Sequence, residues 1–230
     1  MATSGIAAVS AGWRSSFFDG LPPQDRNRIV AAAKHHRFAA NSVVTNQGCP
    51  ADRLFMLTKG RARYFFDEQR GRHILLHWLA PGELIGGKTL LANPGTYLLS
   101  SETVRECSML VWDRATIRGF AVEYPVLLEN GLSTASDYLA WYLAAHVALT
   151  CHSAEERLAG VLDSLAGVIG HKVPGGVEID VTNEELANAA NVTSFTASRL
   201  LGAWQRRSAI KKSRGKILLS RPTRLFPHEL

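Results

Sequence analysis

The stretch TNEELANAANVTSFTASRLLGAWQRR, Thr182 to Arg207, predicts two short helices joined by a tight turn. Thr182 and Glu185 have the S/T-x-x-E spacing of a capping box, which opens a first helix that runs to about Ala189. Thr193 caps a second helix that ends at about Arg206. Small or apolar residues stand where these helices must meet, namely Leu186, Ala190, Val192, Ala197 and Leu200. This pattern is typical of a helix-turn-helix.

The second helix presents Ser194, Phe195, Ser198 and Arg199 outward. An exposed phenylalanine is costly unless it meets a partner. The next segment, IKKSRGKILLS, predicts a strand, a basic turn at Ser213–Lys216 and a second strand. A helix-turn-helix followed by a basic hairpin is a winged helix.

The net charge of +6 is concentrated in the same region. Residues 182–230 carry nine of the 26 Lys and Arg residues but only three of the 20 acidic ones, so the rest of the chain is neutral. A basic surface confined to one module indicates a polyanionic partner such as nucleic acid. The alternative reading of the charge alone is a solubilising tail.

The chain ahead of this module has a different character. The segment PPQDRNRIVAAAKHHRF, residues 22–38, predicts a short helix. From Ser42 to Asp113, short β-rich runs alternate with turns, which predicts a compact antiparallel roll or barrel. The tight turns of this roll are expected at Gly48, Gly60, Gly71 and Gly82.

A long helix is predicted next. Its apolar residues recur at heptad spacing, which predicts a parallel homodimer; packing against the chain's own roll is the alternative. A second capping box, Ser153 and Glu156, places the hinge near Cys151–His152. The expected domains are an effector roll, residues 1–125, a dimerisation helix, 126–151, and a winged-helix DNA-binding domain, 152–230. The predicted seam comprises Leu128, Leu132, Ala135, Leu139, Tyr142, His146 and Leu149.

Composition excludes several classes of protein. No apolar run approaches the twenty residues of a membrane span, and the N-terminal stretch has no basic residues ahead of an apolar block, so neither a membrane helix nor a secretory signal is expected. The three cysteines, Cys49, Cys107 and Cys151, form no C-x-x-C pair, which favours a reducing cytoplasm. No catalytic motif is present, so we do not expect an enzyme.

Taken together, these segments resemble the CRP/FNR family of bacterial transcription regulators from about Ser42 to Leu219. The motifs that carry the resemblance are QGCPADRLFMLTKGRARYFF, LAPGELIG, SRLLG within the second helix, and SRGKILL. The resemblance implies an α+β fold, with an N-terminal cyclic-nucleotide-binding-like antiparallel β-roll, a long dimerisation helix and a C-terminal winged helix-turn-helix. It also implies dimers that bind palindromic operators on double-stranded DNA and contact RNA polymerase.

The chain departs from the family's cyclic-nucleotide pattern. Family members that bind cyclic nucleotides carry a Gly-Glu pair whose Glu holds the ribose and, about ten residues on, an Arg-Ser pair whose Arg holds the phosphate. Gly87 stands at the Glu position here, and Tyr97 and Leu98 stand at Arg-Ser. Because the phosphate would lose its charge-assisted contact, we expect an effector other than cAMP or cGMP, or no effector. The candidate effector pocket comprises Gly86, Gly87, Lys88, Tyr97 and Tyr142.

We predict no cofactor. The iron–sulfur branch of the family needs an N-terminal cysteine cluster, and no cysteine precedes Cys49. Haem remains an alternative, because several potential axial ligands are present: His35, His36, His73, His77, His146 and Cys151.

The resemblance also assigns roles on the second helix. Arg199 resembles the family's guanine-reading arginine, and Ser198 resembles the serine beside it. Phe195 replaces a glutamate that accepts from cytosine N4; a phenyl ring either packs on thymine methyls or relaxes specificity. We expect contacts to the DNA backbone from Thr182, Thr196, Arg214 and Lys216. The leading prediction is a dimeric DNA-binding transcription regulator; the alternatives are a haem or redox sensor on the same fold and a protein-interaction module with a vestigial winged helix.

Overall fold

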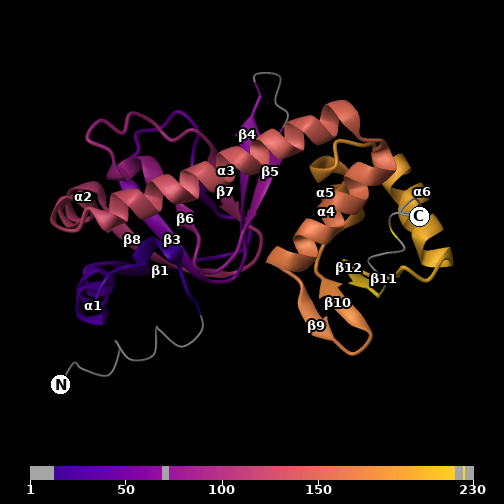
Figure 1. The fold of residues 1–230 in the computed structure, drawn as a ribbon, viewed down its shortest axis with the longest axis horizontal. Coiled ribbons are helices and arrows are strands. Elements are labelled where there is room, and N and C mark those ends of the chain that lie inside the picture. Colours follow the sequence, from indigo (N-terminus) through magenta and orange to yellow (C-terminus); the bar gives the residue numbers. More distant parts are fainter. Residues whose placement is uncertain (1–12, 69–72, 221–224, 226–230) are drawn as a thin grey trace. The chain divides into compact units, whose positions relative to one another are not determined.

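The computed structural model describes residues 13–68, 73–220 and Leu225. The chain divides into two compact units, Met1–Ala140 and Trp141–Leu230. Each unit is built around its own antiparallel sheets, and Figure 1 shows their elements.

Two four-stranded antiparallel sheets form the roll of the first unit. One sheet has the order β1-β8-β3-β6, with β1 Lys34–Phe38, β8 Cys107–Asp113, β3 Arg53–Lys59 and β6 Leu84–Ile85. The other has the order β2-β7-β4-β5, with β2 Val43–Thr45, β7 Ser100–Thr103, β4 Ala62–Asp67 and β5 His73–Leu79. The predicted antiparallel β-roll is therefore confirmed.

Successive side chains of a strand point to opposite faces of the sheet, and in the first sheet both faces carry buried apolar side chains. One face, which includes Met56 and Trp112, packs with the short helices, and the Trp112 indole N–H donates to the Ile29 carbonyl at 2.8 Å. The other face places Phe55 and Met109 in a second buried cluster. The helices of this unit are η1 Ser16–Phe18, α1 Pro23–Ala31, η2 Gly87–Leu90 and α2 Arg114–Glu123.

The single helix predicted for residues 22–38 is wrong in its second half. The helix α1 ends at Ala31, and residues 34–38 form the edge strand β1, which pairs with β8 from Lys34↔Val111 to Phe38↔Cys107. The Phe38 ring meets the Phe55 ring inside the roll at a centroid distance of 6.4 Å. Pairing with a distant strand therefore overrides the local helical tendency.

The predicted glycine turns are confirmed at Gly48, Gly60 and Gly82, whose φ angles are 81°, 100° and 102°. At Gly60 a Cβ atom would lie 2.5 Å from the Glu106 carbonyl oxygen, so the position needs glycine for space as well as for conformation. Gly71 lies outside the described residues.

The long helix α3 runs from Val126 to Cys151. Its first turn is tied to the roll: Leu127 is fully buried and Leu128 is half-buried against the same core. Beyond it, much of the apolar surface is exposed in the single chain. In the part of the chain that the structure describes, no helix combines the length and hydropathy needed to cross a membrane.

A capping box opens the next helix, as predicted. The Ser153 hydroxyl accepts from the Glu156 amide at 3.3 Å, and the Glu156 carboxylate accepts from the Ser153 amide at 2.7 Å. These bonds satisfy amides that would otherwise lack partners where the chain leaves α3.

The second unit is a winged helix. Its elements are α4 Ala154–Val168, β9 His171–Val173, β10 Gly176–Ile179, α5 Asn183–Ala189, α6 Ser194–Arg206, β11 Ile210–Ser213 and β12 Lys216–Leu219. The four strands form an antiparallel sheet in the order β11-β12-β10-β9. Its buried side chains include Leu162, Leu186, Leu201, Trp204 and Ile217. The predicted bounds of both helices and of the basic hairpin agree with the structure.

Candidate nucleic-acid interface and roll pocket

The turn between α5 and α6 is held in place by side chains on both sides. Thr182 caps α5 through the predicted box, with the Glu185 amide donating to Thr182 Oγ1 at 3.2 Å. Asn191 takes a left-handed conformation, with φ of 49°, which lets the chain reverse. Thr193 then caps α6 by accepting from the Thr196 amide at 3.1 Å.

Arg157 of α4 also holds this turn, and sequence reasoning missed it. Its guanidinium donates to the carbonyl oxygens of Ala190 at 3.0 Å and Asn191 at 3.2 Å. Both carbonyls lie where α5 has ended, so they lack helical partners. Arg157 therefore fixes how α6 leaves the turn. The signal was hidden because α4 and the turn lie 33 residues apart in the sequence.

The two faces of α6 differ sharply. Ala197, Leu200, Leu201 and Trp204 are buried. Ser194, Phe195, Ser198 and Arg199 are exposed on the other side, and Phe195 is 79% exposed. Phe195 and Arg199 are four residues apart, so their side chains are neighbours on one helix face. The structure thus gathers these four predicted base-reading residues on one surface.

The predicted backbone-contacting threonines are partly engaged already. Thr182 Oγ1 lies 3.0 Å from a Glu185 carboxylate oxygen, and Thr196 Oγ1 lies 2.9 Å from Thr193 Oγ1. A phosphate oxygen would have to join these small networks.

The two wing cations predicted to contact phosphates, Arg214 and Lys216, have different neighbours. The Lys216 amine donates to Glu178 Oε1 at 2.6 Å and lies 3.6 Å from Asp180 Oδ1. The hydrogen bond to Glu178 raises the pKa of Lys216. Arg214, in the exposed turn before it, makes no hydrogen bond or ion pair with any other described residue. Arg214 is therefore the better placed of the two to meet a phosphate.

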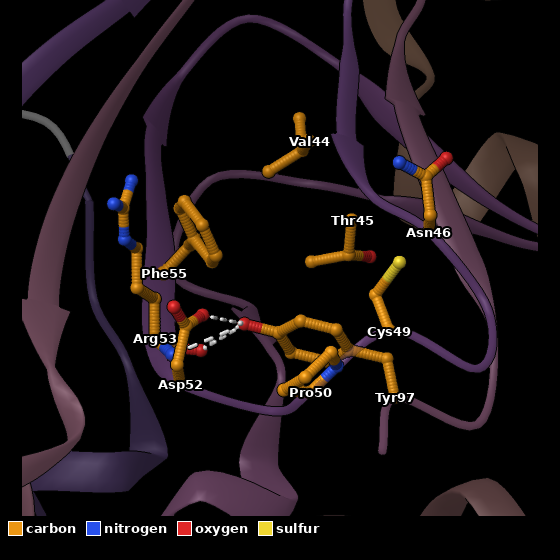
Figure 2. Close-up of a pocket in the computed structure, with 9 residues that line it drawn as sticks. All are labelled: Val44, Thr45, Asn46, Cys49, Pro50, Asp52, Arg53, Phe55 and Tyr97. Atoms are coloured by element: carbon orange, nitrogen blue, oxygen red, sulfur yellow. Dashed lines mark hydrogen bonds between the residues drawn. The ribbon is translucent and has the colours of Figure 1, made fainter.

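In the roll, Tyr97 is the one predicted pocket residue that lines the pocket drawn in Figure 2. The side chain is only 8% exposed, and its hydroxyl accepts from the Arg53 amide at 3.1 Å and donates to the Arg53 carbonyl at 2.9 Å. Burial raises the pKa of the Tyr97 phenol. Gly86 has φ of 85°, and a Cβ there would lie 2.9 Å from the Tyr97 ring, so the ring needs glycine beside it.

Three of the residues predicted to form the effector pocket lie near one another. Gly86, Lys88 and Tyr97 come together, but the Lys88 amine donates to the Thr96 carbonyl at 2.9 Å. Gly87 begins η2 and has open space where a Cβ would lie. Tyr142, on α3, is half-buried.

A small pocket of about 260 Å³ lies against Tyr97 and is lined by other segments: Val44, Thr45, Asn46, Cys49, Pro50, Asp52, Arg53 and Phe55. Gly86, Gly87 and Lys88 do not line it.

The side chains at the predicted phosphate position already have partners within the roll. Tyr97 is buried, and its hydroxyl is bonded to the Arg53 backbone. The nearby Lys88 amine is held by a carbonyl.

The histidines proposed as haem ligands are dispersed. His77 is bonded to Glu83 at 3.1 Å and His73 to Asp67 at 2.6 Å, while His35, His36 and His146 are exposed. Within residues 13–68 and 73–220, no three His, Cys, Asp or Glu side chains are grouped closely enough to hold a metal ion.

The predicted seam of α3 is mostly uncovered in the single chain. Leu132 is 69% exposed and Leu139 is 59% exposed, and Ala135, His146 and Leu149 are exposed too. Tyr142 is half-buried, and Leu128 packs on its own roll.

Comparison with known proteins agrees with both units. Residues 35–124 match the family model of the cyclic nucleotide-binding domain, and residues 156–226 match that of the Crp-like helix-turn-helix domain. A CRP-like cAMP-activated global transcriptional regulator of Mycobacterium tuberculosis is 24% identical over 214 residues, which cover 92% of this chain and 95% of that protein. A cyclic AMP receptor protein of Thermus thermophilus is 23% identical over 203 residues, covering 88% of this chain and 91% of that protein.

Among solved structures, the c-di-GMP-responsive global regulator CLP of Xanthomonas campestris superposes with a TM-score of 0.73 at 19% identity, covering 86% of this chain and 99% of that chain. FixK2 of Bradyrhizobium japonicum also reaches 0.73, at 17% identity, covering 84% of this chain and 95% of that chain. These structures share the fold, and the curated relatives are transcription regulators rather than enzymes. With the roll and the winged helix matched in this order, the chain belongs to the CRP/FNR family of transcription regulators.

Proposed function

We propose that the protein is a cytoplasmic transcription regulator that binds a palindromic operator as a homodimer and reads it with α6. The observation that carries this proposal is the exposed face of α6, where Arg199 stands beside Ser198 and Phe195 without a partner among the described residues. An arginine on such a face can form a bidentate contact with guanine O6 and N7 in the major groove.

The charge distribution supports a nucleic-acid partner. The excess of basic residues lies in the same module as α6 and the wing. Arg199 and Arg214 are exposed there, and neither is neutralised by a described neighbour. Lysines and arginines that are free to meet phosphates supply most of the affinity of a protein for any DNA.

The exposed face of α3 supports the dimer. Leucines that are 59–69% exposed on a long helix are unfavourable in water, and covering them with another apolar surface lowers the free energy. A second copy of the same helix provides that surface at matching heptad positions, and twofold symmetry would set two α6 helices toward two half-sites.

The surroundings of Tyr97 support the proposal that the effector is not a cyclic nucleotide, or that there is no effector. The relatives include one named as cAMP-activated and one described as c-di-GMP-responsive. By the resemblance to the family, Tyr97 stands where cyclic-nucleotide-binding members have a phosphate-binding arginine, and its phenol is buried and bonded to Arg53. By family resemblance, we also propose that the DNA-bound dimer contacts RNA polymerase.

Selection of binding sites from random DNA tests the proposal. The full chain should enrich a twofold-symmetric motif whose half-sites each contain a guanine. Arg199→Ala should then lose about 1–3 kcal/mol of binding free energy on that motif and little on random DNA, measured by fluorescence anisotropy at fixed salt. Lys172→Ala, an exposed cation on the edge strand β9, is the matched control. An equal loss on both DNAs would contradict base reading.

Absence of any DNA binding at low salt would instead favour a protein-interaction module, which the 79% exposed Phe195 would also suit.

A further inference from the structure

Phe195 has the most exposed large apolar side chain among the described residues. It lies at the second residue of α6, after the Thr193 cap, with 79% of its surface exposed. Thr193 caps the helix start by accepting from the Thr196 amide, and Phe195 lies within this capped turn. A ring placed in this way, on the same face as Arg199, is available to meet an apolar group of whatever that face binds.

The partner of Phe195 follows from the proposed function, on which this inference rests. Phe195 and Arg199 are separated by one helical turn, a rise of about 6 Å along α6. Successive base pairs of DNA are about 3.4 Å apart. If Arg199 contacts a guanine, the Phe195 ring therefore lies over a base pair one or two steps away.

The chemistry of base edges decides which base Phe195 prefers. Cytosine and adenine present amino groups in the major groove, and guanine presents two acceptors; a phenyl ring would shield these groups from water without bonding them. Leaving such a group unsatisfied is costly. Thymine presents a C5-methyl group, which a phenyl ring can cover with apolar contact. Ser198, exposed beside Phe195, can bond the remaining thymine oxygen or the paired adenine.

We propose that Phe195 is a specificity-determining residue that reads the C5-methyl group of a thymine one or two base pairs from the guanine bound by Arg199. At this position the protein recognises the base by apolar contact with a methyl group instead of by a hydrogen bond. The operator of this protein therefore has a thymine there, and the methyl group itself contributes to affinity.

Deoxyuridine isolates the methyl group, because it keeps every hydrogen-bonding atom of thymine and lacks only the methyl. The full-length protein is titrated against the selected operator and against the same operator with deoxyuridine at this thymine, using fluorescence anisotropy. Wild-type protein is expected to bind the deoxyuridine probe about fourfold more weakly per half-site, since burying one methyl is worth about 0.8 kcal/mol. Deoxyuridine at a thymine outside the half-sites is the DNA control and should change nothing.

The variant Phe195→Ala should bind the two probes equally, because the ring that senses the methyl is gone. Since Phe195 is exposed, the substitution should leave the fold intact, which circular dichroism checks. The inference is overturned if wild type binds thymine and deoxyuridine probes equally, or if Phe195→Ala remains equally sensitive. A motif that shows any base at this position would also overturn it, in favour of relaxed specificity.

The inference and the proposed function can fail separately. If an operator is recovered and depends on Arg199 but not on the methyl group, only the role of Phe195 is wrong. If no operator is recovered and Arg199→Ala changes nothing, the proposed function itself fails.

Discussion

The hydroxyl of Tyr138 on α3 donates to Oε1 of Glu83 in the roll at 3.1 Å. The same oxygen lies 3.1 Å from Nε2 of His77, and the other oxygen of Glu83 accepts from the Ala80 amide at 2.6 Å. The Tyr138 ring stands edge-on to the His77 ring at 5.1 Å. One carboxylate thus joins the long helix to two parts of the roll, only two residues before the first compact unit ends.

Removing the Tyr138 hydroxyl should therefore weaken the attachment of α3 to the roll and lower the stability of the protein. Tyr138→Phe keeps the ring contacts and deletes one half-buried hydrogen bond to a carboxylate, so the free energy of unfolding should fall by about 1 kcal/mol. Urea denaturation followed by tryptophan fluorescence measures this. The neighbouring Asp137→Asn is the control, because Asp137 is exposed and bonds to no other described side chain. Equal stability of Tyr138→Phe and wild type would contradict the prediction.

The proposed dimer makes a second prediction. Leu139→Glu places a carboxylate at the centre of the apolar seam, and burying that charge without a partner is strongly unfavourable. Sedimentation should then show monomers at concentrations where the wild type is dimeric. Val122→Glu is the control, since Val122 is 65% exposed on α2, away from the seam. Dimers that survive Leu139→Glu would exclude this face of α3 as the interface.

The sequence specified the winged helix closely because its signals are local. Capping boxes are read from residues three apart, and both predicted boxes are present, at Ser153 and at Thr182. The bounds of α5 and α6 follow from these caps. Of the residues predicted to stand where the two helices meet, Val192 is half-buried, and the other four are buried: Leu186, Ala190, Ala197 and Leu200.

The features that could not be predicted from the sequence depend on contacts between residues far apart in the chain. The strand β1 exists because Lys34–Phe38 pairs with Cys107–Val111, more than sixty residues on. The ion pair of Lys216 follows from the β10–β12 register, which places Ile217 opposite Ile179. The bonds from Tyr138 to Glu83 and from Arg157 to the α5–α6 turn span 55 and 33 residues. Neither periodicity nor composition contains such contacts.

The three cysteines should separate into two classes of reactivity. Cys107 is 1% exposed, and burial raises the pKa of its thiol, so less thiolate is present at any given pH. Cys49 and Cys151 are exposed. A disulfide reagent such as DTNB should therefore titrate two thiols in the native protein and the third only in denaturant. The double variant Cys49→Ser, Cys151→Ser should show no fast phase; a fast phase from Cys107 would show that the roll opens readily.

The wing makes the last prediction, because its two cations differ in their neighbours. Arg214 is exposed without a described partner, while Lys216 is held by Glu178 at 2.6 Å with Asp180 nearby. Each phosphate contact contributes about one unit to the slope of log affinity against log salt concentration. Arg214→Ala should therefore lower the slope by about one on operator and random DNA alike.

Lys216→Ala should lower the slope less, because a phosphate must compete with Glu178 for this amine. The variant Glu178→Gln supplies the complementary measurement. It removes the carboxylate that pairs with Lys216, so the slope of log affinity against log salt concentration should become steeper, as expected when both Arg214 and Lys216 can contact phosphates. Binding is measured by anisotropy between low and physiological salt. If Lys216→Ala lowers the slope by a full unit while Arg214→Ala leaves it unchanged, the ion pair opens on DNA and the order of the two cations is reversed.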